Sequence, residues 1–190
     1  MARKIGKVDW SLNIEPPVSI ATVQRWEKNY GPVPDSLKVF LLECAGGIHF
    51  FWSLDDYTDV TAQVQVNGGF CRINLKEMWP QHINEHFQTG EKIEYEERKP
   101  WGWEDYKVVF MEQGNGDYYA ASLTGSEEVV YLNHETLGIT KLGRDIFDFL
   151  EKYTALGCIE QYWDEGLLLS RSGISVSSAE SKKVIRWLGL

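Results

Sequence analysis

Residues 23–47, VQRWEKNYGPVPDSLKVFLLECAGG, decide the fold that this sequence predicts. Up to Gly31, apolar side chains recur every three or four residues, which predicts an amphipathic helix with Ser19 as its N-cap. A second stripe with the same spacing covers residues 37–44 and ends at a pair of glycines. Because two prolines stiffen the link between the stripes, we expect two short helices joined by a tight turn.

Downstream of this stretch the spacing of apolar residues shortens to two, which is typical of half-buried strands. We expect strands over residues 48–54, 70–75, 107–112, 117–123 and 129–134. Gly- and Asn-rich intervals separate several of these runs, and Asn115-Gly116 is the clearest hairpin signal. Strands joined by such short turns run antiparallel.

The two ends of the chain complete the predicted organisation. Helical spacing returns over residues 146–153 and near the C-terminus, where Ser177 and Glu180 have the spacing of a capping box. A short strand is expected over residues 166–170. Residues 1–18 show no period and end in two prolines, so they are interpreted as an irregular leader.

The order of helices, then strands, then helices indicates an α+β fold, with a central antiparallel sheet and helices packed against one face. We expect a leader over residues 1–18, one domain over residues 19–157, and an extension over residues 158–190 that packs on the same domain.

Acidic residues dominate the charge of this 190-residue chain. Asp and Glu number 28 and Lys and Arg number 19, so the formal net charge is −9 at pH 7. This sign argues against a nucleic-acid-binding protein, which needs a basic surface to contact phosphates. It is compatible with a basic protein partner.

Two further properties concern the compartment. The sequence has neither an apolar run long enough to cross a bilayer nor the apolar core of a secretory signal. Its three cysteines are widely spaced and form no CxxC pair, so they are interpreted as small buried side chains. We therefore expect a cytoplasmic protein without disulfides.

The order and spacing of several motifs together resemble the SUKH superfamily. Residues 23–47 are similar to its opening pair of helices, and residues 69–75, GFCRINL, to its Gly-led strand. The resemblance continues in VVFMEQGNGDYYAASL (108–123), VVYLNHE (129–135) and IFDFLEKY (146–153), and covers roughly residues 19–155.

This resemblance implies an α+β fold with a central antiparallel sheet, and a function in protein binding. Many bacterial SUKH proteins are immunity proteins that neutralise a cognate toxin domain, often a nuclease, whereas fungal and animal relatives act as interaction or regulatory modules. The family has no shared set of catalytic residues, so the resemblance assigns none here. The acidic, aromatic segment near residue 100 and the long C-terminal extension depart from the family pattern.

The segment over residues 91–106, EKIEYEERKPWGWEDY, is the first candidate for partner binding, because tryptophans can anchor an interface while carboxylates attract a basic partner. The alternative is a charged loop whose tryptophans fold back onto the sheet. The predicted partner-binding residues are Glu94, Glu96, Glu97, Trp101, Trp103, Glu104 and Asp105, together with Asp55 and Asp56.

Signals for metal binding or catalysis are weaker. His82 and His86 have the i, i+4 spacing of a zinc-binding pair, but the HExxH arrangement and a third ligand are missing. Residues 114–117, GNGD, are interpreted as a hairpin turn, since neither a P-loop nor an EF-hand pattern surrounds them. We therefore predict no catalytic residue, no metal and no cofactor.

Three functions stay open at this point. The first is an immunity protein that binds a toxin domain with a basic surface. The second is a regulatory or scaffold protein without a toxin partner. The third is a hydrolase or metalloenzyme that uses His82 and His86.

Overall fold

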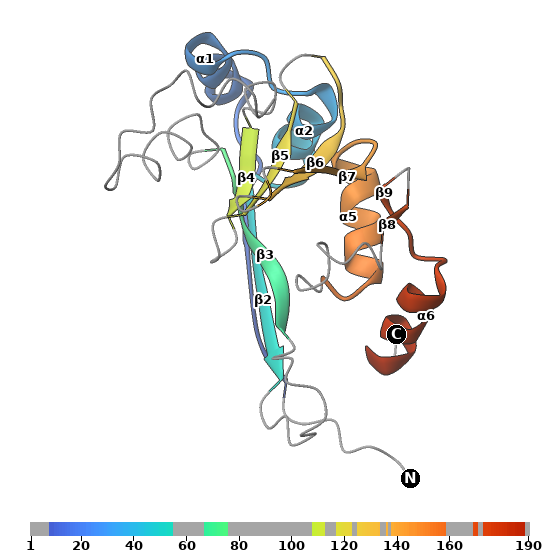
Figure 1. Cartoon of the computed structure of the whole chain (residues 1–190). Helices are drawn as coiled ribbons and strands as arrows, with labels where there is room; N and C mark the ends of the chain where they lie inside the picture. The colour runs from blue at the N-terminus through green and yellow to red at the C-terminus, as the bar shows by residue number, and fades with distance from the viewer. Residues whose placement is uncertain are drawn as a thin grey trace, which may run out of the picture.

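A computed structural model of the chain shows strands, helices and their packing (Figure 1). The residues that it describes are 8–54, 67–75, 108–112, 117–122, 125–133, 136, 138–158, 169–170 and 173–188.

The two helices expected near the N-terminus are present. Helix α1 is Ile20–Tyr30, and its N-cap Ser19 accepts a hydrogen bond of 3.2 Å from the Thr22 N–H, as predicted. The φ of 106° at Gly31 ends the helix, a conformation that glycine adopts without steric cost. Helix α2, Asp35–Val39, continues directly into a π-helical turn, η1, over Phe40–Cys44.

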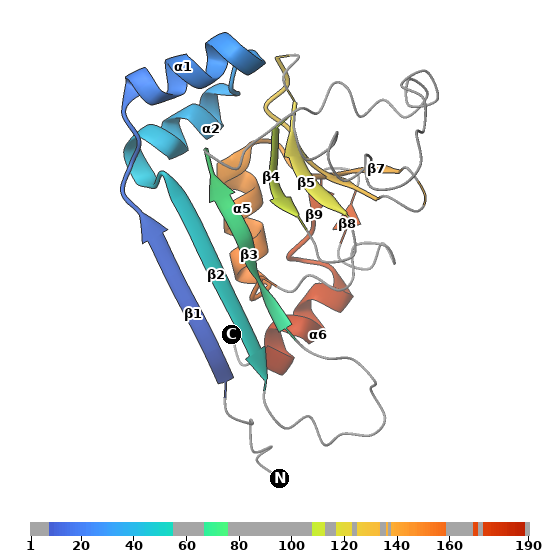
Figure 2. The same cartoon turned by 90° about the vertical axis from the view of Figure 1, so that its left-hand side faces the viewer.

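Every strand pair in the described residues is antiparallel. One sheet has the order β1-β2-β3 and a second has the order β4-β5-β6-β7, and β3 contacts β4 (Figure 2). The first sheet consists of β1 (Val8–Glu15), β2 (Gly47–Leu54) and β3 (Asn67–Asn74). The second consists of β4 (Val108–Glu112), β5 (Tyr118–Ala121), β6 (Val129–Leu132) and β7 (Ile139–Gly143). A small third sheet pairs β8 (Leu169–Ser170) with β9 (Gly173–Ile174).

An aromatic cluster forms the centre of the core. Helix α5, Ile146–Ala155, brings Phe149 and Tyr153 against Tyr119 of β5, and Tyr131 of β6 packs on the same Tyr119 ring. The rings of Phe149 and Tyr153 stack with centroids 5.2 Å apart, and those of Tyr119 and Phe149 are 5.8 Å apart. All four side chains are buried, so these rings stabilise the core.

The C-terminal end of α5 is fastened to the first sheet. The Tyr153 hydroxyl donates to the Gly69 carbonyl at 3.0 Å, and the Gly69 N–H donates to the Cys158 carbonyl at 2.9 Å. A Cβ atom at Gly69 would lie 2.1 Å from the Phe50 carbonyl oxygen, so only glycine fits there. Figures 1 and 2 show α5 and α6 (Ala179–Leu188) on one side of this sheet, so the predicted α+β fold with helices on one face is confirmed.

Some local predictions are wrong. The predicted irregular leader contains the regular strand β1, and β7 was not predicted at all. Helix α6 is capped by Ser178, whose hydroxyl accepts from the Ser181 N–H at 3.0 Å, and not by Ser177. Of the cysteines, Cys158 is buried as expected but Cys44 is exposed.

Residues of the C-terminal extension contribute to the core. Ile174 of β9 is buried in the same cluster as Leu142 of β7. A Cβ atom at Gly173 would lie 2.2 Å from the Leu142 carbonyl oxygen, so the two strands approach closely. Among the described residues, no helix combines the length and the apolar character that a bilayer span requires.

Candidate protein-binding surface

Three large apolar side chains on β1 are exposed to solvent. Trp10 is 67% exposed, Leu12 50% and Ile14 55%. They occupy alternate positions of the strand and therefore lie on one face of the sheet. We call these three residues the apolar edge strip.

The apolar edge strip lies on the same face of the first sheet as α5, but one strand beyond the part of that face that α5 covers. In the register between β1 and β2, Trp10 lies opposite Trp52, Leu12 opposite Phe50, and Ile14 opposite Ile48. Directly opposite residues share a face. Trp52 is buried, and its Nε1 donates to the Gly157 carbonyl at 2.7 Å, just beyond the end of α5.

Figure 2 shows β1 as the outer strand, with α5 behind β3 and none of the described helices across β1. The same face is therefore covered on β2 and exposed on β1. Full burial of a side chain such as leucine or isoleucine contributes about 1.5–3 kcal/mol. Because the three side chains of the strip stay largely exposed, much of this free energy is not gained on folding and can be gained when another molecule covers them.

The charged residues of β1 are both acidic. Asp9 and Glu15 occupy the alternate positions, together with Ser11 and Asn13. Phe51 of β2 lies opposite Ser11 and therefore on this second face, and its side chain is 41% exposed. The edge of the sheet therefore has an apolar face and a mixed face with negative charge, in a chain whose net charge is −9.

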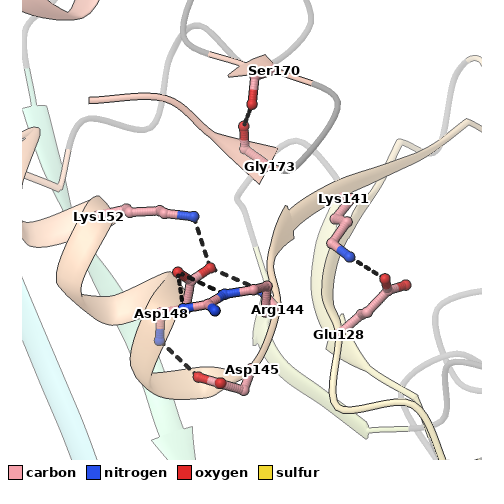
Figure 3. A network of polar contacts seen from close by, with 8 residues as sticks. All are labelled: Glu128, Lys141, Arg144, Asp145, Asp148, Lys152, Ser170 and Gly173. Carbon is pink, nitrogen blue, oxygen red and sulfur yellow. Dashed lines mark hydrogen bonds and ion pairs between the residues drawn. The ribbon is translucent and has the colours of Figure 1, made fainter. Parts of the chain in front are cut away.

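A second group of charged residues, around Asp148, has a structural role (Figure 3). The Asp148 carboxylate is 7% exposed and accepts from the Arg144 N–H at 2.9 Å and from Lys152 Nζ at 2.8 Å. Burial disfavours its ionised form, but these hydrogen bonds outweigh burial and hold the pKa of Asp148 below its usual range. Asp145 caps the same helix by accepting from the Asp148 N–H at 2.8 Å. These contacts fasten the first turns of α5.

Glu127 performs a similar task at the start of α2. Its carboxylate accepts from the N–H groups of Asp35 and Ser36, each at 2.9 Å, and from the Ser36 hydroxyl at 2.6 Å. Burial disfavours the charged form, yet these donors hold the pKa of Glu127 below its usual range. The Glu127 carboxylate thus caps the start of α2 by accepting hydrogen bonds from its first N–H groups.

The residues that the sequence singled out for partner binding lie outside the described residues. These are Asp55, Asp56, Glu94, Glu96, Glu97, Trp101, Trp103, Glu104 and Asp105. The same is true of His82 and His86. Their roles stay predictions. Within the described ranges, no group of three or more His, Cys, Asp or Glu side chains is arranged to hold a metal ion.

Of the predicted hairpin turn at residues 114–117, the structure describes Asp117. Its side chain is buried, and the Tyr131 hydroxyl donates a hydrogen bond to its carboxylate. The strands on either side, β4 and β5, pair antiparallel, so the predicted hairpin pairing is confirmed.

The family of the chain follows from a comparison with protein-family models. The model of the SMI1 / KNR4 family (SUKH-1) matches residues 17–152. The chain belongs to the SUKH-1 family. This confirms the SUKH resemblance that the sequence motifs carried over roughly residues 19–155. No curated protein matches the chain.

The apolar edge strip lies outside the region matched by the SUKH-1 model, which begins two residues after β1 ends. The sequence prediction missed this strip, although a signal was present. Residues 8–15, VDWSLNIE, alternate apolar and polar side chains as a strand does. The flanking residues 1–7 and 16–18 have no such period, so the alternation is confined to one short stretch.

Proposed function

We propose that this SUKH protein is an immunity protein, which binds a toxin domain stoichiometrically and blocks it without catalysis. The observation that carries the proposal is the apolar edge strip, an exposed row of Trp10, Leu12 and Ile14 on a strand whose charged residues are acidic. In this proposal the strip forms the centre of the contact.

The composition of the strip supports a role in protein binding. Tryptophan is enriched among the residues that contribute most to interface affinity. Trp10 buries little of its surface within the chain, so a partner can still gain most of the free energy of its burial. An exposed row of large apolar side chains is also a solubility hazard, which a protein retains where the row has a use.

The charge of the chain supports a basic target. A nuclease toxin needs a basic site for the phosphates of its substrate, and a chain with a net charge of −9 is attracted to such a site. The acidic residues of the segment 91–106, with Asp55 and Asp56, complete the proposed surface by attracting the partner before contact. The proposal places both proteins in the cytoplasm, where the substrate of a nuclease is found.

Co-expression with the toxin domain encoded beside this gene tests the proposal. We expect restored growth and a stoichiometric complex on gel filtration. The double variant Trp10→Ser, Leu12→Ser should weaken the complex by at least about tenfold. Ile139→Ser, on an exposed residue of β7, is the matched control and should leave the affinity unchanged.

A toxin that stays fully active beside soluble chain, with no complex formed, would contradict the immunity function. The absence of any toxin gene in the neighbourhood would contradict it as well. That second result would favour the alternative, a regulatory or scaffold protein, which needs the same exposed strip but no toxin.

A further inference from the structure

We infer that the partner binds by adding a strand to the outer edge of β1, and that this strand alternates apolar residues with lysine or arginine. The inference rests on the proposed function in one respect, since it names the kind of segment that a toxin would present to this surface.

The position of β1 in the sheet makes strand addition possible. The order β1-β2-β3 places it at the end of its sheet, and Figure 2 shows it as the outermost strand. A β-strand directs the N–H and C=O groups of alternate residues to its two sides. The side of β1 that faces away from β2 therefore carries a row of main-chain groups along an eight-residue strand.

β1 lacks most of the features that normally prevent edge pairing, and its two charged residues, Asp9 and Glu15, lie near the two ends of the strand. Proteins protect an exposed edge with charged side chains, above all lysine, with proline or a bulge, or by keeping the strand very short. Residues 8–15, VDWSLNIE, contain neither lysine nor proline. All eight residues pair with β2 in one continuous register, from Val8 opposite Leu54 to Glu15 opposite Gly47.

The far strand of the second sheet, β7, gives an internal comparison. It carries Lys141 at its centre, which pairs with Glu128, and its register with β6 is shifted between Val129 and Val130. β9 also packs closely against it at Gly173. The edge strand β7 therefore has protective features, and β1 does not share them.

The two faces of β1 define the chemistry of the added strand. Residues directly opposite each other in an antiparallel pair share a face and contact each other. Residues opposite Trp10, Leu12 and Ile14 must be apolar to cover them. Residues opposite Asp9 and Glu15 must be neutral or basic, because like charges placed directly opposite destabilise a strand pair.

The same rule disfavours a second copy of this chain as the occupant. In the antiparallel register that aligns all three apolar side chains, Trp10 faces Ile14 and Leu12 faces Leu12. That register also places Asp9 of each copy opposite Glu15 of the other. Both copies would in addition carry a net charge of −9. A basic strand has neither disadvantage.

A peptide probe tests strand addition without a toxin. The probe is an eight-residue, end-capped peptide of alternating valine and lysine, added to the full isotope-labelled chain while amide hydrogen exchange is followed by NMR. We expect the amides of every second residue between positions 9 and 15 to exchange at least about tenfold more slowly. A peptide with its lysines in one block followed by its valines, and a peptide of alternating valine and glutamate, are the controls and should change these rates by less than about twofold.

Variants of the strip link the protection to its side chains. Trp10→Thr, on an exposed strand residue, should weaken peptide binding at least about fivefold, while the core amides of α5 keep their exchange rates. Ile139→Thr is the matched control. Unchanged exchange along β1, equal binding of the blocked peptide, or a concentration-dependent dimer of the chain alone would each overturn strand addition.

The outcomes separate this inference from the proposed function. If the alternating peptide protects β1 but the chain neutralises no toxin, the edge binds strands and the immunity function is wrong. If a toxin is neutralised while the β1 amides of the complex exchange as in the chain alone, the immunity function holds and strand addition is wrong.

Discussion

Trp10 and Trp52 lie directly opposite each other on one face of the first sheet, yet Trp52 is buried and Trp10 is 67% exposed. Trp52 donates its indole N–H to the Gly157 carbonyl beyond α5, whereas Trp10 lies one strand further out, on β1. The sheet is therefore wider than the helix that covers it, and the uncovered part of its apolar face is the candidate binding surface.

Substitution of these two tryptophans should have very different effects on the free energy of unfolding. Trp52→Ala should lower the free energy of unfolding by about 3–5 kcal/mol, because it leaves a cavity beside α5. Trp10→Ser should change it by less than about 0.5 kcal/mol, as is usual for surface residues. Urea unfolding of both variants measures this difference. A loss of several kcal/mol in Trp10→Ser would show that the strip is part of the folding core.

The carboxylate of Glu127 should make the stability of the protein depend on pH. Its folded pKa lies below the ordinary value, so the stabilisation is present at neutral pH and is lost as the pH falls through the acidic range. In Glu127→Gln, the decline in unfolding free energy between about pH 5 and pH 3 should be shallower than in wild type. Urea titrations across this range measure the slope.

Ser36→Ala serves as a graded control for that experiment. It removes the hydroxyl donor at 2.6 Å and keeps the two main-chain N–H donors. Its slope should lie between those of wild type and Glu127→Gln. A slope in Glu127→Gln equal to that of wild type would exclude this carboxylate as a source of the acid sensitivity.

Asp148 should contribute to stability far more than its exposed neighbour Glu151. Asp148→Ala removes a buried carboxylate that accepts from Arg144 and Lys152, and we expect a loss of about 1–3 kcal/mol. Glu151→Ala, on the exposed side of α5, should change the unfolding free energy by less than about 0.5 kcal/mol. Thermal unfolding by circular dichroism compares them, and equal melting temperatures would refute a structural role for the Asp148 contacts.

The predicted anchors in the segment 91–106 can be tested by two measurements on the same variants. If Trp101 and Trp103 contact the toxin, Trp101→Ala and Trp103→Ala should each raise the Kd at least about tenfold with little change in unfolding free energy. If the two rings pack on the sheet, the same variants should lower the unfolding free energy by about 3–5 kcal/mol. That second pattern would remove these tryptophans from the proposed surface.

Local signals in the sequence were enough to predict most of the elements. The two ends of α1, at Ser19 and Gly31, were predictable because capping depends on a few neighbouring atoms. The period of the apolar residues distinguishes the helices from β2 and β6. The motif order also predicted the SUKH family correctly. β1 was not predicted, because its eight alternating residues are flanked by residues without such a period. The predicted binding residues, from Asp55 to Asp105, stay predictions.

Sequence by itself determined most of the helices and strands of this protein, with β1 and β7 as the exceptions, and it also determined that the strands pair antiparallel and to which family the chain belongs. Tertiary structure alone decided that Trp10 is exposed and Trp52 buried, since the two lie directly opposite each other and only Trp52, on the inner strand, is known to contact the residues that follow α5. It also decided that Glu127 fastens the start of α2, 91 positions away from Ser36. Burial and long-range hydrogen bonds depend on which elements pack together, and this is settled by the whole chain and not by any short stretch of it.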